Sequence, residues 1–401
     1  MYLTYPRQTS LINTLYAGLI LLPTPSRITL WWNFGSLLGL CLVIQIITGV
    51  ILVSHYTPHP EYAFISIIRI WDDTSRGWLC RSIHANGSRF FFVSVYLHIG
   101  RGLYFTSWRL SHVWGSGVLI ILLLIITSFL GYVLPWGQIS FWGATVITNL
   151  LSAVPYFGGG VVTWLWGGFA ISGDTLTRFF MLHFISPFIL LVIVMAHLFA
   201  LHITGSSSPV GVISDFDKVP FHPYFSYKDI VGVLVLLTFL ILLVLHHPWL
   251  LGDPENFLEA NPLITPIHIM PEWYFLIAYA ILRSIPNKLG GVIGLVLSVI
   301  ILWVLLLTPP RVISFSNSPF LKGRFFVLVI VAVLLTWRGG NPVEYPFIEV
   351  SQALRLSYFS LFMIIILLCF YFSSPERYSE EIEVIVEKGV VKYNIKPAPW
   401  R

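Results

Sequence analysis

An all-α integral membrane protein with eight transmembrane helices is the fold class that the sequence predicts. The first four helices are expected to form a four-helix bundle. Of the 401 residues, 56% are hydrophobic and only 10% are charged, whereas soluble domains carry roughly 25% charged residues. Eight apolar runs approach the roughly 20 residues that a membrane-spanning helix needs. In addition, four histidines recur inside two of these runs at one fixed spacing.

The predicted spans follow one another along the whole chain. They are residues 33–54, 77–104, 113–134, 174–203, 230–247, 290–308, 320–338 and 348–372. An even number of spans places both termini on one side of the membrane. The long loops 135–173 and 248–288 then lie together on the opposite face, where a site is expected. The distribution of Lys and Arg favours the negative side for the termini.

These spans divide the chain into four regions. Residues 1–32 are expected to form an N-terminal surface segment, without the pattern of a secretory signal or transit peptide. Residues 33–210 hold the four-helix bundle and its long loop, and residues 211–373 form a second membrane domain. Residues 374–401 are a charged, amphipathic tail that is expected to lie on the surface.

Composition excludes several classes of function. The net charge of +5 is scattered, and no basic cluster is interleaved with aromatic residues, so nucleic acid is not an expected partner. The three cysteines lie far apart and no C-x-x-C-H is present. Covalent haem attachment, a zinc site and an iron–sulfur cluster are therefore not expected. Any metal would have to be bound by histidine.

Two pairs of histidines carry the chemistry. His84 and His98 are 14 residues apart in span 77–104, and His183 and His197 are 14 apart in span 174–203. Fourteen residues return to nearly the same face of a helix, about 21 Å further along. One span separates these two helices, so they run parallel. His84 should therefore be level with His183 near the loop-rich face, and His98 level with His197 near the terminus face.

Two pairs of glycines repeat the same spacing. Gly35 and Gly49 lie 14 residues apart in the first span, and Gly117 and Gly131 lie 14 apart in the third. These helices run antiparallel to the histidine helices. Gly49 and Gly131 then share a level with His84 and His183, and Gly35 and Gly117 share the other level. Close packing of helices on small residues is the alternative explanation. However, the matching register favours a flat macrocycle that approaches the backbone at each glycine.

The predicted cofactors are two haems. Zinc would require three or four ligands at one level, and each level offers two histidines. Bis-imidazole ligation leaves a haem iron no open position, which suits electron transfer. Arg81 and Arg101 each lie three residues from a histidine and are placed to pair with haem propionates. Interfacial snorkelling is the alternative role of these arginines. The first four spans are thus predicted to form a diheme four-helix bundle.

Several long motifs resemble mitochondrial cytochrome b, the haem-bearing core subunit of ubiquinol–cytochrome c oxidoreductase (respiratory complex III), over residues 1–372. They are HANG, GYVLPWGQISFWGATVITNLLSAVPYFGG, LTRFF, LLGDPENFLEANPL and PEWYFLIAYAILRSIPNKLGG. The resemblance implies a low-potential haem on His84 and His183 and a high-potential haem on His98 and His197. It also implies a multi-pass protein of the mitochondrial inner membrane. The implied partners are a Rieske iron–sulfur protein, a c-type cytochrome, other complex III subunits, membrane lipid and a second copy of the complex.

The resemblance further implies two sites for ubiquinol and ubiquinone. The positive-side oxidation site takes its residues from PEWY and the segments that face it: Tyr132, Gly143, Pro271, Glu272, Phe275 and Tyr279. Glu272 is the candidate acceptor of the quinol proton. The negative-side reduction site takes Ser36, His202, Lys228 and Asp229. Without the resemblance, a solvated loop carboxylate and a helix-end aspartate would be the expected roles of Glu272 and Asp229.

Departures from the family pattern leave all four histidines unchanged. Met270 stands where a lysine commonly precedes PEWY, and Ser207 and Ser208 replace asparagines. Two other functions would explain parts of this pattern. A transporter with a buried histidine proton path is disfavoured because inverted repeats with broken helices are not evident. A diheme membrane anchor for a dehydrogenase explains the bundle but not PEWY or the last four spans.

Overall fold

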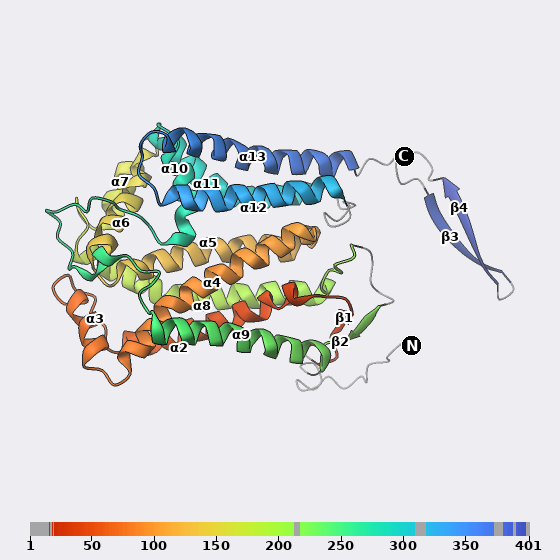
Figure 1. Cartoon of the computed structure of the whole chain (residues 1–401), viewed down its shortest axis with the longest axis horizontal. Coiled ribbons are helices and arrows are strands. Elements are labelled where there is room, and N and C mark those ends of the chain that lie inside the picture. The colour runs from red at the N-terminus through yellow and green to blue at the C-terminus, as the bar shows by residue number, and fades with distance from the viewer. Residues whose placement is uncertain are drawn as a thin grey trace.

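The computed structural model describes residues 20–211, 217–308, 318–372, 380–387 and 390–397, with Tyr16 and Gly18, and side chains as far as Tyr371. Eight long helices run side by side through this part of the chain (Figure 1). They are α2 (Phe34–Val53), α4 (Gly77–Tyr104), α5 (Ser111–Val133), α8 (Gly173–Thr204), α9 (Tyr224–His246), α11 (Lys288–Val304), α12 (Pro319–Gly339) and α13 (Phe347–Phe372). Each coincides with one predicted span, although α9 begins six residues earlier than expected.

Seven of these helices are long and apolar enough to cross a membrane. Seven of the eight predicted spans therefore have the length and composition of a membrane-spanning helix. The remaining helix, α4, has 28 residues, which corresponds to a length of about 42 Å. Its sequence contains Arg81, Arg89 and Arg101, and charged residues inside a spanning helix are costly unless they pair or line a cavity. Hydropathy alone consequently does not identify α4 as a span.

The first four long helices pack around a shared core. Helix α2 lies along α4, α5 lies along α8, and α2 also contacts α8. Their buried apolar side chains form one cluster, to which all four helices contribute: Leu37, Cys41, Leu42, Phe91, Phe92, Val95, Ile121, Leu124 and Leu190. The four-helix arrangement is as predicted from the sequence.

Helices α11, α12 and α13 form a second group with the short helix α10 (Leu276–Arg283). A separate apolar cluster joins this group to α4 and α5, with Leu103 and Val118 on the bundle side and Ile301, Leu335 and Phe362 on the other. The two halves of the chain therefore share a packed interface.

The connections that contain α-helices of their own gather at one end of the long helices, on the left of Figure 1. They include α3 (Ala63–Asp72), α6 (Gln138–Asn149) and α7 (Gly158–Trp166). The loop before α11 carries η4 (Pro254–Phe257) and η5 (Trp273–Phe275). Gln138 fastens this loop to α6, donating to the Ile264 carbonyl at 3.0 Å and accepting from the Asn261 amide at 2.7 Å. The predicted loop-rich face is thus present.

Two short antiparallel sheets complete the described structure. Strand β1 (Pro23–Pro25) pairs with β2 (Lys218–Pro220), and β3 (Glu380–Glu387) pairs with β4 (Val390–Pro397). The second pair lies in the charged tail, where the sequence predicted only a surface extension.

The outer surface of the helices is strongly apolar. Val192 and Phe199 on α8 are each 69% exposed, and Phe239 on α9 is 61% exposed. Apolar side chains turned outward along whole helices are expected where lipid, rather than water, surrounds the protein. The exposed faces therefore agree with a multi-pass membrane protein.

Candidate functional site

The four histidines form two facing pairs inside the bundle. The ring centroids of His84 and His183 are 6.3 Å apart, and those of His98 and His197 are 6.5 Å apart. An imidazole nitrogen bonds a metal at about 2 Å, so one metal between two facing rings separates their centroids by about 6 Å. Each pair therefore has the spacing for a single bridged metal.

Hydrogen bonds at Nδ1 orient three of these rings. His183 Nδ1 lies 2.8 Å from the Thr127 carbonyl, and His84 Nδ1 lies 2.8 Å from the Thr48 hydroxyl. The Thr48 hydroxyl already donates to the Ile44 carbonyl, so it accepts from His84. Protonated Nδ1 leaves the lone pair of Nε2 for a metal, the arrangement that commonly orients histidine ligands.

The second level repeats this arrangement on one side only. Ser116 donates its hydroxyl proton to backbone carbonyls of α5 and lies 2.9 Å from His197 Nδ1, from which it accepts. Arg101 instead places Nη2 at 3.1 Å from His98 Nδ1. A guanidinium can only donate. Arg101 must therefore leave His98 before Nε2 of that ring can bind a metal.

Each predicted glycine faces a histidine of its own level. A Cβ added at Gly49 would lie 3.2 Å from His84 Cε1, and one at Gly131 would lie 2.4 Å from His183 Cε1. On the second level, a Cβ at Gly117 would lie 3.4 Å from His197, and one at Gly35 would lie 3.6 Å from His98. The layers of two histidines and two glycines are present as the sequence predicted.

The surroundings of the histidine pairs fit a haem. Among the described residues, no cluster of three or more His, Cys, Asp and Glu side chains could hold a metal, which argues against zinc. Near the second level, Arg101 Nε and Trp32 Nε1 are buried and have no hydrogen-bond partner among the described groups. The Arg101 guanidinium lies over the Trp32 ring at 5.2 Å. Two neighbouring N–H donors without a partner are suited to hydrogen-bond a carboxylate, such as a propionate of a bound haem.

A cavity of about 280 Å³, the histidine cavity, lies at the first level. His84, His183, Gly49, Gly131 and Arg81 all line it. The Arg81 guanidinium lies 5.0 Å from the centroid of the Trp249 ring, which also lines this cavity. This cavity brings together every residue that the sequence assigned to the first haem.

A larger cavity of about 1170 Å³, the PEWY cavity, lies beside the bundle. All six residues predicted for quinol oxidation line it: Tyr132, Gly143, Pro271, Glu272, Phe275 and Tyr279. A Cβ added at Gly143 would meet no heavy atom within 4 Å, so the space in front of this glycine is open. The volume is ample for a ring-sized apolar ligand.

Aromatic contacts position the PEWY segment on α4. The Tyr274 ring stacks on Phe92 with centroids 4.0 Å apart and planes 3° apart, and the Tyr96 hydroxyl donates to the Tyr274 carbonyl. Burial raises the pKa of Tyr274, and the neighbouring Glu272 carboxylate raises it further. Burial also raises the pKa of Tyr279, whose hydroxyl donates to the Ile269 carbonyl at 3.0 Å. Both phenols therefore stay protonated at neutral pH.

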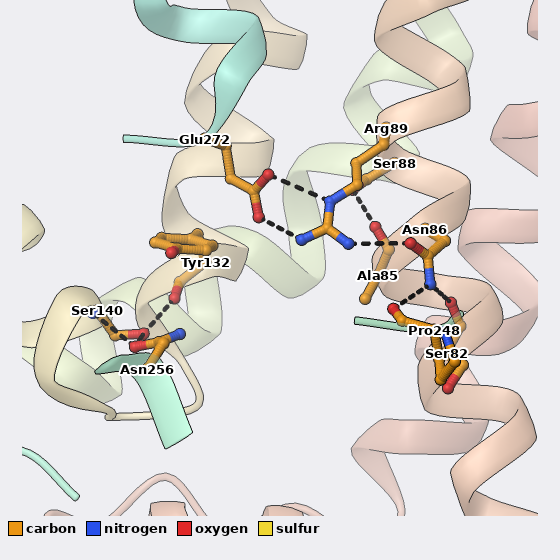
Figure 2. A network of polar contacts seen from close by, with 10 residues as sticks. All are labelled: Ser82, Ala85, Asn86, Ser88, Arg89, Tyr132, Ser140, Pro248, Asn256 and Glu272. Carbon is orange, nitrogen blue, oxygen red and sulfur yellow. Dashed lines mark hydrogen bonds and ion pairs between the residues drawn. The ribbon is translucent and has the colours of Figure 1, made fainter. Parts of the chain in front are cut away.

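Glu272 forms a buried ion pair that the sequence analysis did not foresee (Figure 2). Arg89 Nη2 lies 2.7 Å from Glu272 Oε1, and Arg89 Nε lies 3.2 Å from Oε2. Both side chains are only 7% exposed. A signal did exist in the sequence, because Arg89 lies inside the predicted span 77–104, and intramembrane charges are rare and usually functional.

The residues predicted for quinone reduction are only partly brought together. Ser36 lies within hydrogen-bonding reach of Asp229. Lys228 donates instead to the Ile28 carbonyl at 2.5 Å. His202 is exposed in the last turn of α8, and within the described residues no hydrogen bond joins it to Asp229. The residues predicted for quinol oxidation are therefore gathered more closely than those predicted for quinone reduction.

Gly131→Ala should displace His183 and remove the haem signal of the first level. A methyl 2.4 Å from Cε1 is far closer than the contact distance of about 3.5–4.0 Å between carbon atoms. The matched control is Gly39→Ala, because a Cβ there meets nothing within 4 Å. Reduced-minus-oxidised spectra check both variants. Equal haem content in the two variants would contradict the layer geometry.

The fold and the site together define a class of protein. It is a multi-pass membrane protein whose helical bundle holds two levels of facing histidines. Comparison with known proteins agrees. The family model described as cytochrome b/b6/petB matches residues 19–205. The model described as cytochrome b (C-terminal)/b6/petD matches residues 259–359.

A solved structure described as hyperthermophilic respiratory Complex III is similar to the chain along most of its length. The TM-score is 0.85 at 33% sequence identity, over 90% of this chain and 98% of that chain. The chain therefore belongs to the cytochrome b/b6 family, and membership implies binding of b-type haem.

Proposed function

We propose that this protein is the diheme cytochrome b subunit of a quinol–cytochrome c oxidoreductase. The observation that carries the proposal is the pair of histidine levels, each with two facing imidazoles and two facing glycines. His84 and His183 would hold the low-potential haem, and His98 and His197 the high-potential haem. Two b haems, when bound, transfer single electrons between levels about 21 Å apart.

Quinol oxidation is assigned to the PEWY cavity. Quinol must lose two electrons and two protons to become quinone. Glu272 reaches this cavity and is the carboxylate placed to accept one proton. Tyr132 and Tyr279 line the same cavity. A phenol hydroxyl can donate or accept a hydrogen bond; the Tyr279 hydroxyl already donates to the Ile269 carbonyl, which leaves its oxygen free to accept from a quinol hydroxyl. One electron would leave for a Rieske iron–sulfur protein, and the other would cross the bundle.

Quinone reduction is assigned to the opposite end of the bundle. Asp229 and Ser36 lie together there, and a carboxyl group beside a quinone can supply the proton that reduction consumes. His202 and Lys228 would complete this site after a rearrangement of their side chains. Proton release at one face and uptake at the other would contribute to a proton gradient through a Q cycle.

Asp229→Asn should slow quinone reduction without changing haem content. The amide keeps the shape of the side chain but cannot deliver a proton, and general acid catalysis contributes about 10²–10⁴-fold. The check is reoxidation of the reduced haems by added ubiquinone. Asp217→Asn serves as control, because Asp217 lies at the surface beside Ser26 and Arg27. Equal slowing in both variants would contradict the assignment.

The proposal includes the assembly and the membrane. Helix α4 would be the eighth span, since it runs the length of the bundle between helices that qualify. A Rieske protein, a c-type cytochrome, other complex III subunits and a second copy of the complex are the proposed partners. The solved neighbour comes from a respiratory Complex III, and the motif resemblance supports a place in the mitochondrial inner membrane.

The function is tested by ubiquinol-dependent reduction of cytochrome c in the purified complex. We expect turnover that requires both the b haems and the Rieske partner. A complex that holds both haems but does not oxidise quinol would contradict the proposal and favour a diheme anchor.

A further inference from the structure

We propose that Arg89 is a positioning residue for quinol oxidation, which holds the Glu272 carboxylate in the wall between the histidine cavity and the PEWY cavity. The inference rests on the proposed function, because it concerns the same oxidation site. Glu272, Tyr132 and Tyr274 line both cavities, while Arg89 lines the histidine cavity. The ion pair therefore stands where a quinol ring and a haem would be closest.

The contact between the two side chains is specific in direction. Two parallel hydrogen bonds, of 2.7 and 3.2 Å, join the guanidinium to both carboxylate oxygens. Such bidentate pairs fix orientation as well as distance. Glu272 consequently faces α4 before any quinol enters, and its proton-accepting oxygens occupy one set of positions.

Asn86 holds the Arg89 guanidinium on the side away from Glu272, as Figure 2 shows. Arg89 Nη1 donates to Asn86 Oδ1 at 2.9 Å. The Asn86 amide donates to the Ser82 carbonyl at 3.1 Å and to the Pro248 carbonyl at 2.9 Å. All three guanidinium nitrogens therefore donate hydrogen bonds, two of them to Glu272 and one to Asn86. This chain of bonds links the end of α9 through Asn86 and Arg89 to PEWY.

A role in helix packing alone does not explain this placement. Arg89 lies five residues after His84, about 140° around the helix from the histidine face, and its partner is a loop residue rather than another long helix. A lysine would keep the charge, but it could not form the parallel bonds and the third bond to Asn86. Arginine is thus suited to setting the position of Glu272, beyond balancing its charge.

The test compares Arg89→Gln, Glu272→Gln and the double variant in the purified complex. Arg89→Gln should lower kcat for ubiquinol oxidation about 10²-fold, since small misplacements of catalytic groups cost that much, with a smaller change in KM. The double variant should be no slower than the slower single variant, because the two residues act as a unit. Arg89→Lys should fall between the wild type and Arg89→Gln.

A second readout does not depend on turnover. Glu272→Gln leaves the Arg89 charge unbalanced beside the histidine cavity, and arginine cannot lose its proton. The midpoint potential of the haem on His84 should therefore rise, and the double variant should return it towards the wild-type value. The potential of the haem on His98 should not change. An Arg89 that is not paired with Glu272 in the working complex predicts no such opposition, so this readout tests the ion pair itself, and the kcat comparison tests its positioning role.

Arg69→Gln is the matched control, because Arg69 is an exposed arginine on α3 at the same face; it should behave as wild type. Normal kcat in Arg89→Gln together with slow turnover in Glu272→Gln would overturn the role of Arg89 but leave the proposed oxidation site standing. Multiplicative losses in the double variant would also overturn that role. Normal turnover in Glu272→Gln would instead overturn the oxidation site itself.

Discussion

His183→Ala is expected to remove the haem at the first level and leave the haem at the second level in place. The substitution deletes one of two facing imidazoles and also frees the Thr127 carbonyl that orients the ring. One remaining ligand, His84, cannot provide bis-imidazole ligation. The second level lies about 21 Å away along the helix and uses other side chains, so it should bind its haem normally.

The measurement is a redox titration of the b-haem absorbance in the isolated complex. The wild type should titrate in two steps, and the variant should retain only the higher-potential step, with about half the absorbance. His112→Ala is the control, because His112 is exposed at the start of α5 and belongs to neither level. Two unchanged steps in His183→Ala would contradict the pairing of His84 with His183.

Glu272→Gln is expected to slow quinol oxidation by about 10²–10⁴-fold, the usual contribution of a general base. Glutamine has nearly the same shape but cannot take a proton from quinol. Its loss of charge also leaves Arg89 buried without an ionic partner, which is costly for a side chain 7% exposed. The rate of b-haem reduction by ubiquinol in a single turnover measures the effect.

Haem content must be compared first, so that unfolding is not mistaken for a catalytic defect. Glu344→Gln is the control, since this exposed residue lies between α12 and α13. Reoxidation of the haems by ubiquinone should be nearly normal in Glu272→Gln. Equal slowing of oxidation and reduction would show that Glu272 does not belong to the oxidation site alone.

The sequence was sufficient to predict the long helices and the two histidine levels. Apolar runs of sufficient length specify spans, and a fixed spacing on parallel helices specifies levels. The placement of Gly49 level with His84 and of Gly131 level with His183 followed from the spacing and the order of the spans, whereas the close approach of the histidine rings to these glycines was not predicted. The length of a helix, the spacing of residues along it and its direction relative to its neighbours can all be obtained from a single sequence.

Contacts made by flexible side chains could not be predicted in this way. Glu272 was expected to face the quinol, and nothing in its local sequence indicated Arg89, which is 183 residues away. The contact of the Arg101 guanidinium with His98 was likewise not indicated by the sequence, and the pairing of Arg101 with a haem propionate stays a prediction. Long side chains have many rotamers, and their choice depends on the packing of several elements.

We propose that four histidines hold two b haems in each chain. The most direct test is a dithionite-reduced minus oxidised spectrum of the purified protein, together with a determination of the number of haems per chain. The account predicts b-type absorbance with two non-covalently bound haems per chain. It also predicts that His183→Ala lowers this number to one. Absence of b-type absorbance, or a wild-type value of one haem, would contradict it.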